Sequence, residues 1–194
     1  MAALTDPLRR FEAWFAEAEH AGVEVPETMT LATATADGTP SARMVLLKGA
    51  DAAGFVFYSG YVSRKAAELD ENPRAALVFY WQRLGKQVRV EGTVERVPEA
   101  ESTAYFATRP RGSRLAAWAS QQSQPLASRE ELESRYAELE REYEGRDVPL
   151  PPHWGGFRLR PEAIEFWEHR ENRLHDRTRY TRAREGWSVE FLSP

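Results

Sequence analysis

The sequence predicts a mainly β protein with peripheral helices, of the α+β class, and three observations support this. Short strand-like segments bounded by turn residues dominate the chain, as in antiparallel sheets. Helical patterns are inserted between them without the strict strand–helix alternation of a doubly wound parallel sheet. No internal repeat or low-complexity segment divides the 194 residues. A small β-barrel with helices around it, as a single domain over residues 1–194, fits all three.

The first half of the chain predicts two helices and five strands. Asp6-Pro7 is typical of a helix start, and apolar residues at helical spacing continue until Gly22. Asp37-Gly38 is a hairpin turn signal, and Asn72-Pro73 ends a second helix. The strands are expected at residues 30–35, 43–48, 55–58, 75–81 and 87–97, and the second helix at residues 63–71.

The second half predicts three helices followed by three strands. A capping-box pattern beginning at Ser128 opens the third of these helices, which is the most charged. A loop is expected over residues 145–152. The helices are expected at residues 99–108, 113–120 and 128–143, and the strands at residues 156–167, 177–182 and 187–191.

Composition excludes several classes of function. The formal net charge of -4 disfavours non-specific nucleic-acid binding, so any anion site must be a local basic cluster. The absence of cysteine removes disulfides, thiolate zinc sites and cysteine nucleophiles. The histidines have no metal-ligand spacing, and no dinucleotide or P-loop fingerprint is present. Without an apolar run of about 20 residues or a secretory signal, we expect a cytoplasmic protein with no membrane, nucleic-acid or metal partner.

The segment Arg173-Leu174-His175-Asp176-Arg177 shows the most evident chemistry in the chain. Alternate side chains share a face in an extended segment, so Arg173, His175 and Arg177 would point the same way. Two fixed positive charges beside a titratable ring pack poorly and suit an anion or a cofactor. The segment therefore predicts a ligand site.

Two other basic segments lie at predicted helix starts, Ser63-Arg64-Lys65 and Arg109-Pro110-Arg111-Gly112-Ser113. A phosphate suits such positions, because free backbone N–H groups point at it and the cations offset its charge. The alternatives are a solvated helix start with tolerated charges at the first segment and a basic loop at the second. Two phosphate sites would indicate two phosphorylated ligands, such as a cofactor and a substrate.

Four further residues have two interpretations each. Lys48 closes an apolar strand that we expect to be buried, and its ammonium could stand at a cavity mouth or extend to water. Gln87 and Gln122 could hydrogen-bond the edge of a heteroaromatic ring or have no role. Trp167 could stack on such a ring or belong to the core.

Seven motifs follow one another along the chain. They are Arg43-Met44-Val45-Leu46-Leu47-Lys48, Tyr58-Ser59, Ser63-Arg64-Lys65, Arg109-Pro110-Arg111, Gln122-Ser123, Glu165-Phe166-Trp167 and Arg173-Leu174-His175-Asp176-Arg177. In this order they strongly resemble the pyridoxine/pyridoxamine 5′-phosphate oxidase family. Single motifs are weak signals, but seven in order are hard to obtain by chance. The likeness extends from about residue 6 to residue 194.

This resemblance implies an FMN-binding split β-barrel of Greek-key type that forms a homodimer with FMN at the interface. Residues 155–194 would complete the active site. The FMN contacts would be Arg43, Met44, Val45, Leu46, Tyr58, Ser59, Arg64, Lys65, Gln87, Gln122, Ser123, Trp167 and Arg177. The substrate contacts would be Lys48, Tyr105, Arg109, Ser113, Arg173 and His175. Arg64 and Lys65 would then hold the FMN phosphate, and the group around Arg109 the substrate phosphate.

The implied reaction oxidises pyridoxine or pyridoxamine 5′-phosphate to pyridoxal 5′-phosphate by hydride transfer from C4′ to flavin N5. Dioxygen reoxidises the flavin and leaves hydrogen peroxide. Arg173 and His175 are the catalytic residues in this scheme. Arg173 would orient the substrate and stabilise charge, and His175, with an ordinary pKa near ~6.5, would hydrogen-bond the substrate.

Two rival functions remain open at this point. A related flavin oxidase of phenazine biosynthesis would be expected to lack the substrate-phosphate residues, yet Lys48, Arg109 and Ser113 are present. A non-catalytic flavin-binding module could dispense with Arg173 and His175, which are also present.

The N-terminus departs from the family pattern. Family members often carry a basic, tyrosine-containing segment that covers the substrate. Only five residues precede Asp6 here, so we expect that cover to be absent or truncated.

Overall fold

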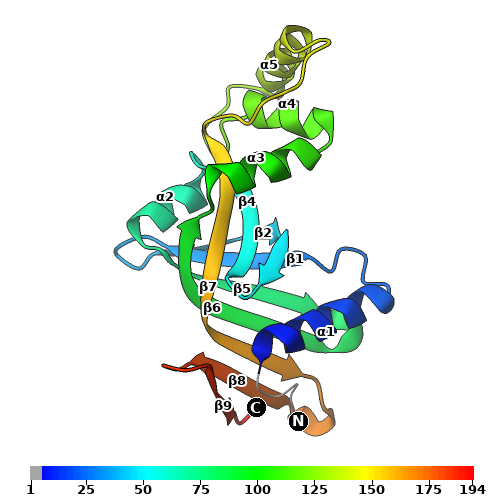
Figure 1. The fold of residues 1–194 in the computed structure, drawn as a ribbon, viewed down its shortest axis with the longest axis vertical. Coiled ribbons are helices and arrows are strands. Elements are labelled where there is room, and N and C mark those ends of the chain that lie inside the picture. The colour runs from blue at the N-terminus through cyan, green and yellow to red at the C-terminus, as the bar shows by residue number, and fades with distance from the viewer. Residues whose placement is uncertain (1–5) are drawn as a thin grey trace.

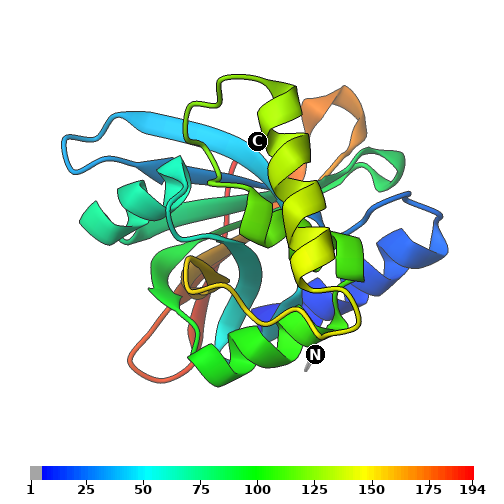
Figure 2. The ribbon, with the colours of Figure 1, turned by 90° about the horizontal axis from the view of Figure 1, so that it is seen from above.

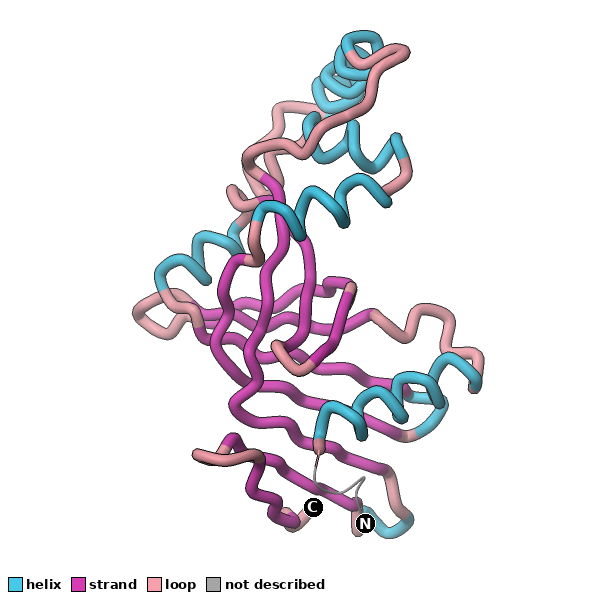
Figure 3. The backbone as a smooth tube through the Cα atoms, viewed as in Figure 1, coloured by secondary structure: helices cyan, strands magenta, loops and turns pink. Residues whose placement is uncertain are grey.

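The computed structural model describes residues 6–194, so the expectation about the first five residues lies outside the described range. The centre of the molecule is one antiparallel sheet in the order β2-β1-β5-β6-β7-β4-β3, with β8 on β7 and β9 on β8. Figure 3 shows the strands crossing and curling around one another, with helices outside them. The predicted mainly β fold with peripheral helices is confirmed.

Most elements lie close to where the sequence predicts them. The strands are β1 Thr28–Ala34, β2 Pro40–Leu46, β3 Gly49–Asp51, β4 Gly54–Gly60, β5 Arg74–Trp81, β6 Lys86–Arg96, β7 Trp154–Glu168, β8 Asp176–Arg182 and β9 Trp187–Phe191. The helices are α1 Pro7–His20, α2 Arg64–Glu71, α3 Glu99–Thr108, α4 Arg111–Ala119 and α5 Arg129–Glu142. Single 3₁₀ turns are formed by Gln82–Leu84 and Glu171–Arg173.

Local signals explain several of these boundaries. Asp6 caps α1, because its Oδ1 accepts a hydrogen bond of 3.0 Å from the Leu8 N–H while Pro7 occupies the first helical position. The Asp37-Gly38 turn joins β1 to β2, and Gly38 has a φ of 87°, in the left-handed region that glycine tolerates. The predicted helix start and the predicted hairpin are both confirmed.

The core lies between α1 and the concave face of the sheet. The Phe11 ring on α1 lies 5.0 Å, centroid to centroid, from Phe55 on β4 and 5.0 Å from Phe79 on β5. Trp14, one turn further along α1, meets Phe166 of β7 edge-on at 5.1 Å. All five rings are buried. Truncation of such a ring typically costs about 3–5 kcal/mol, so α1 is an integral part of the barrel.

Helices α3, α4 and α5 gather at one end of the sheet, and β8 and β9 lie at the other (Figure 1). Figure 2, seen from the helical end, shows α5 lying over that end. The long strand β7 connects the two ends, pairing with β4 at its start and with β8 at its finish. Residues from both ends are therefore tied to one rigid strand.

Three sequence predictions need correction. A short strand, β3, lies between the strands expected at residues 43–48 and 55–58, where the sequence predicts no strand, because this segment pairs with β4. Helix α4 begins at Arg111, two residues earlier than predicted. The apolar run after Arg43 is not a buried strand in the chain: β2 is an edge strand, and Met44 and Leu46 are 61% and 41% exposed.

Candidate active site

A cavity of about 390 Å³ opens where β4 meets the helical end of the sheet. We call it the Arg109 cavity. Its walls come from the strand ends around β4 and β7 and from helices α3 and α4. It is lined by Leu46, Lys48, Tyr58, Ser59, Gly60, Tyr105, Arg109, Ser113, Ala116, Ala117, Ser120, Gln122, His153 and Trp154. The structure thus brings together Lys48, Tyr105, Arg109 and Ser113, the four residues expected at a substrate phosphate.

Arg109 is the most distinctive group in this cavity. Its Nη1 is buried and has no hydrogen-bond partner among the described residues. The guanidinium lies 4.5 Å from the centre of the Trp154 ring, and burial lowers the pKa of Arg109 from its ordinary value. A buried cationic donor without a partner is unfavourable, and an anion would satisfy it. The cavity is therefore chemically suited to a phosphate.

Three stacked aromatic rings line the cavity beside Arg109. Tyr58 and Tyr105 stack with centroids 3.9 Å apart, and Trp154 lies parallel to Tyr58 at 5.4 Å. Burial, with a smaller effect of the Glu101 carboxylate, raises the pKa of Tyr58 to about 12. The Tyr58 hydroxyl consequently keeps its proton at neutral pH and can donate a hydrogen bond.

Lys48 and Ser113 occupy the margins of the Arg109 cavity. The Lys48 Nζ lies 3.8 Å from a carboxylate oxygen of Glu27, and both side chains are partly exposed. Ser113 lies in the first turn of α4, so its hydroxyl is close to the helix N-terminus, where anions are favoured. Lys48 is a rim cation whose partner is another surface group, in contrast to Arg109.

A second cavity, of about 500 Å³, lies between β2, the end of β4 and the start of α2. We call it the Lys65 cavity. It is lined by Ser41, Ala42, Arg43, Met44, Val45, Tyr58, Ser59, Arg64, Lys65, Gln122 and Ser123. Nine of these residues are among those expected to contact FMN. Tyr58, Ser59 and Gln122 line both cavities, so the two cavities share a wall.

Lys65 is the buried cation of this cavity. Its Nζ donates to the hydroxyls of Ser59 and Ser63, at 2.9 and 3.2 Å. Burial, together with the nearby Arg43 guanidinium, lowers the pKa of Lys65 to about 8. Ser63 stands at the N-cap position of α2, where its side chain makes no capping bond to the helix and accepts from Lys65.

The shared wall is fixed by Gln122. Its Oε1 accepts hydrogen bonds from the Ser59 hydroxyl at 2.9 Å and from the Gly60 N–H at 2.8 Å. A Cβ at Gly60 would lie 3.1 Å from that oxygen, so glycine permits this close approach. Ser123 follows with a φ of 69°, which turns the chain sharply at the cavity edge. Gln122 thus has a structural position in both cavities, and Ser123 has one in the Lys65 cavity.

The remaining predicted residues form a separate group, the terminal cluster, where the start of β6, the end of β7 and the start of β8 lie side by side. Gln87, Trp167 and Arg177 face one another across these three strands in register. The His175 ring lies 4.6 Å from the Trp167 ring. Neither cavity has a lining residue from this cluster, which comprises Gln87, Trp167, Arg173, His175 and Arg177.

The prediction that Arg173, His175 and Arg177 share one extended face is wrong. Asn172 and Arg173 have φ values of 56° and 62°, in a 3₁₀ turn, and β8 begins only at residue 176. Arg177 donates from Nε to Glu165 at 2.8 Å and from Nη1 to a backbone carbonyl near the C-terminus. The turn separates Arg173 from the strand, and Glu165 neutralises Arg177.

The protonation of His175 can be assigned from its neighbours. Its Nδ1 lies 3.2 Å from the backbone N–H of Arg170, which can only donate. In the neutral ring the proton is therefore on Nε2. Burial, then His169 and Arg173, lower the pKa of His175 from its ordinary value. His175 consequently offers an N–H donor at neutral pH.

Two comparisons with protein families match almost the whole chain. Residues 15–142 match the family described as pyridoxamine 5′-phosphate oxidase, and residues 154–194 match the pyridoxine 5′-phosphate oxidase C-terminal dimerisation region. The chain belongs to the pyridoxine/pyridoxamine 5′-phosphate oxidase family. The second match supports a homodimer for this family member.

Curated relatives support the same assignment. A pyridoxine/pyridoxamine 5′-phosphate oxidase of Rubrobacter xylanophilus is 64% identical over 189 residues, covering 97% of this chain and 87% of the relative. A protein of the same name from Bordetella pertussis is 55% identical over 193 residues, covering 99% and 91%. The family resemblance predicted from the motifs is confirmed.

Solved structures confirm the split-barrel fold. PhzG from Burkholderia lata 383, in complex with tetrahydrophenazine-1-carboxylic acid, has a TM-score of 0.94 at 35% identity and covers 98% of this chain and 93% of that chain. An FMN-binding protein from Nostoc punctiforme, related to pyridoxamine 5′-phosphate oxidase, has a TM-score of 0.76 at 18% identity, covering 95% and 97%. The latter likeness concerns the fold alone.

The structure adds three residues that the sequence reasoning missed. The Trp154 ring makes a cation–π contact with the Arg109 guanidinium. Glu27 forms an ion pair with Lys48, and Glu68 forms ion pairs with Arg43 and Arg64. Only Glu68 had a local signal, its spacing of four residues from Arg64 on one helix. The other two contacts join segments far apart in the sequence.

Two further findings concern the described residues only. From residue 6 to the C-terminus, no group of three or more His, Asp or Glu residues could hold a metal ion. Over the same range, no helix combines the length and the apolar character needed to cross a membrane.

Proposed function

We propose that this family member is an FMN-dependent oxidase that converts pyridoxine or pyridoxamine 5′-phosphate to pyridoxal 5′-phosphate. The observation that carries the proposal is the buried Nη1 of Arg109, which has no hydrogen-bond partner within residues 6–194, in a cavity that shares a wall with a second cationic cavity. Two adjacent anion-binding cavities suit a phosphorylated substrate lying beside a phosphorylated cofactor. The curated relatives carry the names of this same activity.

FMN suits the residues of the Lys65 cavity. A buried ammonium with only hydroxyl partners, close to two arginines, is a donor set for a phosphate. When bound, FMN supplies the acceptor for a hydride, and dioxygen regenerates it with release of hydrogen peroxide. The residues of this cavity proposed to hold it are Arg43, Met44, Val45, Tyr58, Ser59, Arg64, Lys65, Gln122 and Ser123. Leu46, which is also proposed to contact FMN, lines the adjoining Arg109 cavity instead.

The Arg109 cavity is proposed to hold the substrate phosphate. Arg109 would give it charge-assisted hydrogen bonds, Ser113 a hydroxyl at a helix start, and Lys48 a further cation at the rim. Tyr105 lies against Tyr58 and bounds the space between the two cavities. This arrangement positions a substrate and leaves the redox chemistry to the cofactor.

A second copy of the chain is proposed to complete the site. In one chain β8, which begins at the terminal cluster, lies at the opposite end of the sheet from α3 and α4 (Figure 1), two helices that line the Arg109 cavity. Residues 155–194 include most of that cluster and nearly coincide with the matched dimerisation region. An interface that contains FMN would let Gln87, Trp167 and Arg177 of one protomer reach the flavin held by the other.

Arg173 and His175 are proposed to contact the substrate ring in that dimer. Arg173 is exposed and ends the turn Glu171–Arg173 with a φ of 62°, which is uncommon for a residue with a side chain. His175 would donate from Nε2, because the Arg170 N–H occupies its Nδ1. Its role is therefore that of a hydrogen-bond donor at neutral pH.

Turnover with both substrates tests the function. Purified protein should be yellow and release FMN on denaturation. With pyridoxine 5′-phosphate and air it should form equal amounts of pyridoxal 5′-phosphate and hydrogen peroxide, and with pyridoxamine 5′-phosphate also ammonia. Flavin-loaded protein that turns over neither compound would refute the proposal.

The likeness to PhzG supports a second candidate, an oxidase of phenazine-type substrates. The carboxylate of such a substrate would also pair with Arg109, but Lys48 and Ser113 in the same cavity add the further cation and hydroxyl that suit a phosphate, which favours the vitamin B6 substrates. A direct comparison of tetrahydrophenazine-1-carboxylic acid with pyridoxine 5′-phosphate distinguishes the two. A non-catalytic flavin-binding module would show no turnover of either.

A further inference from the structure

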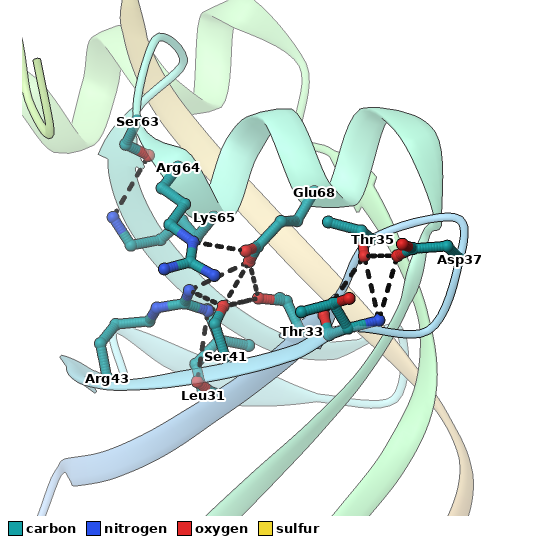
Figure 4. Close-up of polar contacts among 11 residues, drawn as sticks. Leu31, Thr33, Thr35, Asp37, Ser41, Arg43, Ser63, Arg64, Lys65 and Glu68 are labelled. Atoms are coloured by element: carbon teal, nitrogen blue, oxygen red, sulfur yellow. Dashed lines mark hydrogen bonds and ion pairs between the residues drawn. The ribbon is translucent and has the colours of Figure 1, made fainter.

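A buried carboxylate behind the Lys65 cavity has no part in the function proposed so far. Glu68 lies on α2 and is only 3% exposed. Figure 4 shows it between α2 and the β1–β2 hairpin, facing a group of hydroxyls and guanidinium nitrogens. Buried carboxylates are rare unless they are paired, so its partners reveal its role.

Glu68 accepts four hydrogen bonds from three elements. Its Oε2 accepts from the hydroxyls of Thr33 on β1 and Ser41 on β2, at 2.5 and 2.6 Å, and from Arg43 Nη2 at 3.1 Å. Its Oε1 accepts from Arg64 Nε at 2.8 Å. One carboxylate therefore contacts both arginines of the proposed FMN-phosphate site.

The two hydroxyls connect Arg43 to Glu68 a second time. Arg43 donates from Nη1 to Thr33 and from Nη2 to Ser41, and an arginine cannot accept in return. Each hydroxyl consequently turns its own proton toward Glu68. Both terminal nitrogens of Arg43 are fixed by this arrangement, and so is the plane of the guanidinium (Figure 4).

Glu68 also shapes the charge of the cavity. Burial alone would raise its pKa, but the hydrogen bonds from Ser41, Thr33, Arg64 and Arg43 outweigh burial and lower the pKa of Glu68 to about 2. It is ionised at neutral pH and offsets part of the charge of the two arginines. Lys65, whose Nζ bonds only hydroxyls among the described residues, is left as the cation least compensated.

We propose that Glu68 is a positioning residue for FMN, which holds Arg43 and Arg64 in the orientation that receives the flavin phosphate. The inference rests on the proposed function, in which the Lys65 cavity takes that phosphate. Glu68 itself lies behind the arginines and acts through them. A simple brace between α2 and the hairpin would instead affect every flavin alike, with or without a phosphate.

The test compares FMN with riboflavin, which lacks the phosphate. Full-length protein is freed of flavin and titrated with each compound, following flavin fluorescence, for the unaltered chain and for Glu68→Gln. We expect the Kd for FMN to rise about tenfold or more in the variant, because Arg43 loses its anionic partner. The Kd for riboflavin should stay within about twofold.

Asp70→Asn is the matched control, since it makes the same change on the same helix. Asp70 pairs with Arg96 at the surface and lines neither cavity. It should leave both dissociation constants unchanged. An equal weakening of FMN and riboflavin in Glu68→Gln, or no weakening of FMN, would overturn the inference.

Thr33→Val decides the question if Glu68→Gln does not fold. It removes one of the two hydroxyl links and leaves the carboxylate charge in place, and Thr33 lines neither cavity, so FMN should bind about threefold more weakly with riboflavin unaffected. An unchanged Kd for FMN in Thr33→Val would count against the inference. If the unaltered chain shows no preference for FMN over riboflavin, the proposed phosphate site itself fails, and the inference fails with it.

Discussion

The two cavities hold their cations in different ways. In the Lys65 cavity, Arg43 and Arg64 are bound to Glu68, and Lys65 is bound to Ser59 and Ser63. In the Arg109 cavity, a buried guanidinium nitrogen has no hydrogen-bond partner in the described part of the chain. The first site is organised by the chain itself, and the second is completed only by a ligand.

This difference suits two kinds of ligand. A site whose donors are already oriented loses little entropy when it binds, which favours tight retention of a cofactor. A site with an unsatisfied buried donor discriminates strongly for a ligand that carries the matching acceptor. The cavities therefore separate retention of a cofactor from selection of a substrate, although they share a wall.

The largest expected effect lies outside both cavities. Arg173→Ala should lower kcat/KM about 100-fold, as loss of a group that stabilises developing charge does. FMN occupancy should stay normal, because Arg173 lines neither cavity. The measurement is steady-state oxidation of pyridoxine 5′-phosphate. Arg184→Ala, in the exposed turn after β8, is the control, and a normal kcat/KM for Arg173→Ala would remove this residue from the mechanism.

Arg109→Ala should raise KM roughly 10- to 100-fold, corresponding to the loss of one or two charge-assisted hydrogen bonds. It should change kcat little and FMN affinity not at all, because the two cavities bind different phosphates. Steady-state kinetics with a flavin titration measures all three. Arg111→Ala is a suitable control, since Arg111 donates to backbone carbonyls of Tyr143 and Arg146. A loss of FMN affinity in Arg109→Ala would contradict the prediction that the two cavities bind different phosphates.

The pH dependence of FMN affinity should follow Lys65. Its pKa of about 8 in the flavin-free protein means that the ammonium loses its charge as pH rises through that value. The Kd for FMN should therefore rise above pH 8, whereas that for riboflavin should not. Lys65→Met should raise the Kd for FMN on the order of tenfold at pH 7 and abolish the further rise in Kd above pH 8. If the Kd for FMN still rises above pH 8 in the variant, a group other than Lys65 causes the pH dependence.

The same pKa makes a prediction about stability. The pKa of Lys65 is lowered in the folded protein, so between about pH 8 and its ordinary value of 10.5 the unfolded chain binds more protons. Through this group alone, the free energy of unfolding should increase with pH over that window. Denaturant titrations of flavin-free protein should show less increase in Lys65→Met than in the unaltered chain.

A smaller effect should come from Trp154, whose ring lies against the Arg109 guanidinium. Trp154→Leu should raise KM about three- to tenfold, because a cation–π contact in a desolvated site contributes about 1 kcal/mol or somewhat more. Trp154→Phe keeps an aromatic face and should recover part of the loss. If Phe and Leu behave alike, Trp154 acts by filling space and not through its ring.

The smallest effect should come from the exposed ion pair at the rim. Glu27→Gln should change KM less than about threefold, because solvent-exposed pairs contribute little. Kinetics at low and moderate salt measure it. A large decrease in KM would mean that Glu27 holds Lys48 away from the substrate phosphate.

The sequence by itself determined most elements of the fold and the chemical types in the site. Short-range signals such as the Asp6 cap, the Asp37-Gly38 turn and the stop at Pro73 act over a few residues, so they can be read directly from the chain. The ordered motifs determined the family. Val88, Val90 and Val94 alternate with polar residues along β6, a pattern that places one face of a strand in the core, and all three are buried.

Only the tertiary structure decided how the charges are paired. Glu68 neutralises Arg43 across the β1–β2 hairpin, and Glu165 neutralises Arg177 across two strands. Over the part of the chain that the structure describes, Arg109 has a buried nitrogen without a hydrogen-bond partner. The turn at Asn172 also breaks the single basic face expected near the C-terminus. Pairing depends on distances between segments that are far apart in sequence, and these distances are set when the sheet closes around its core.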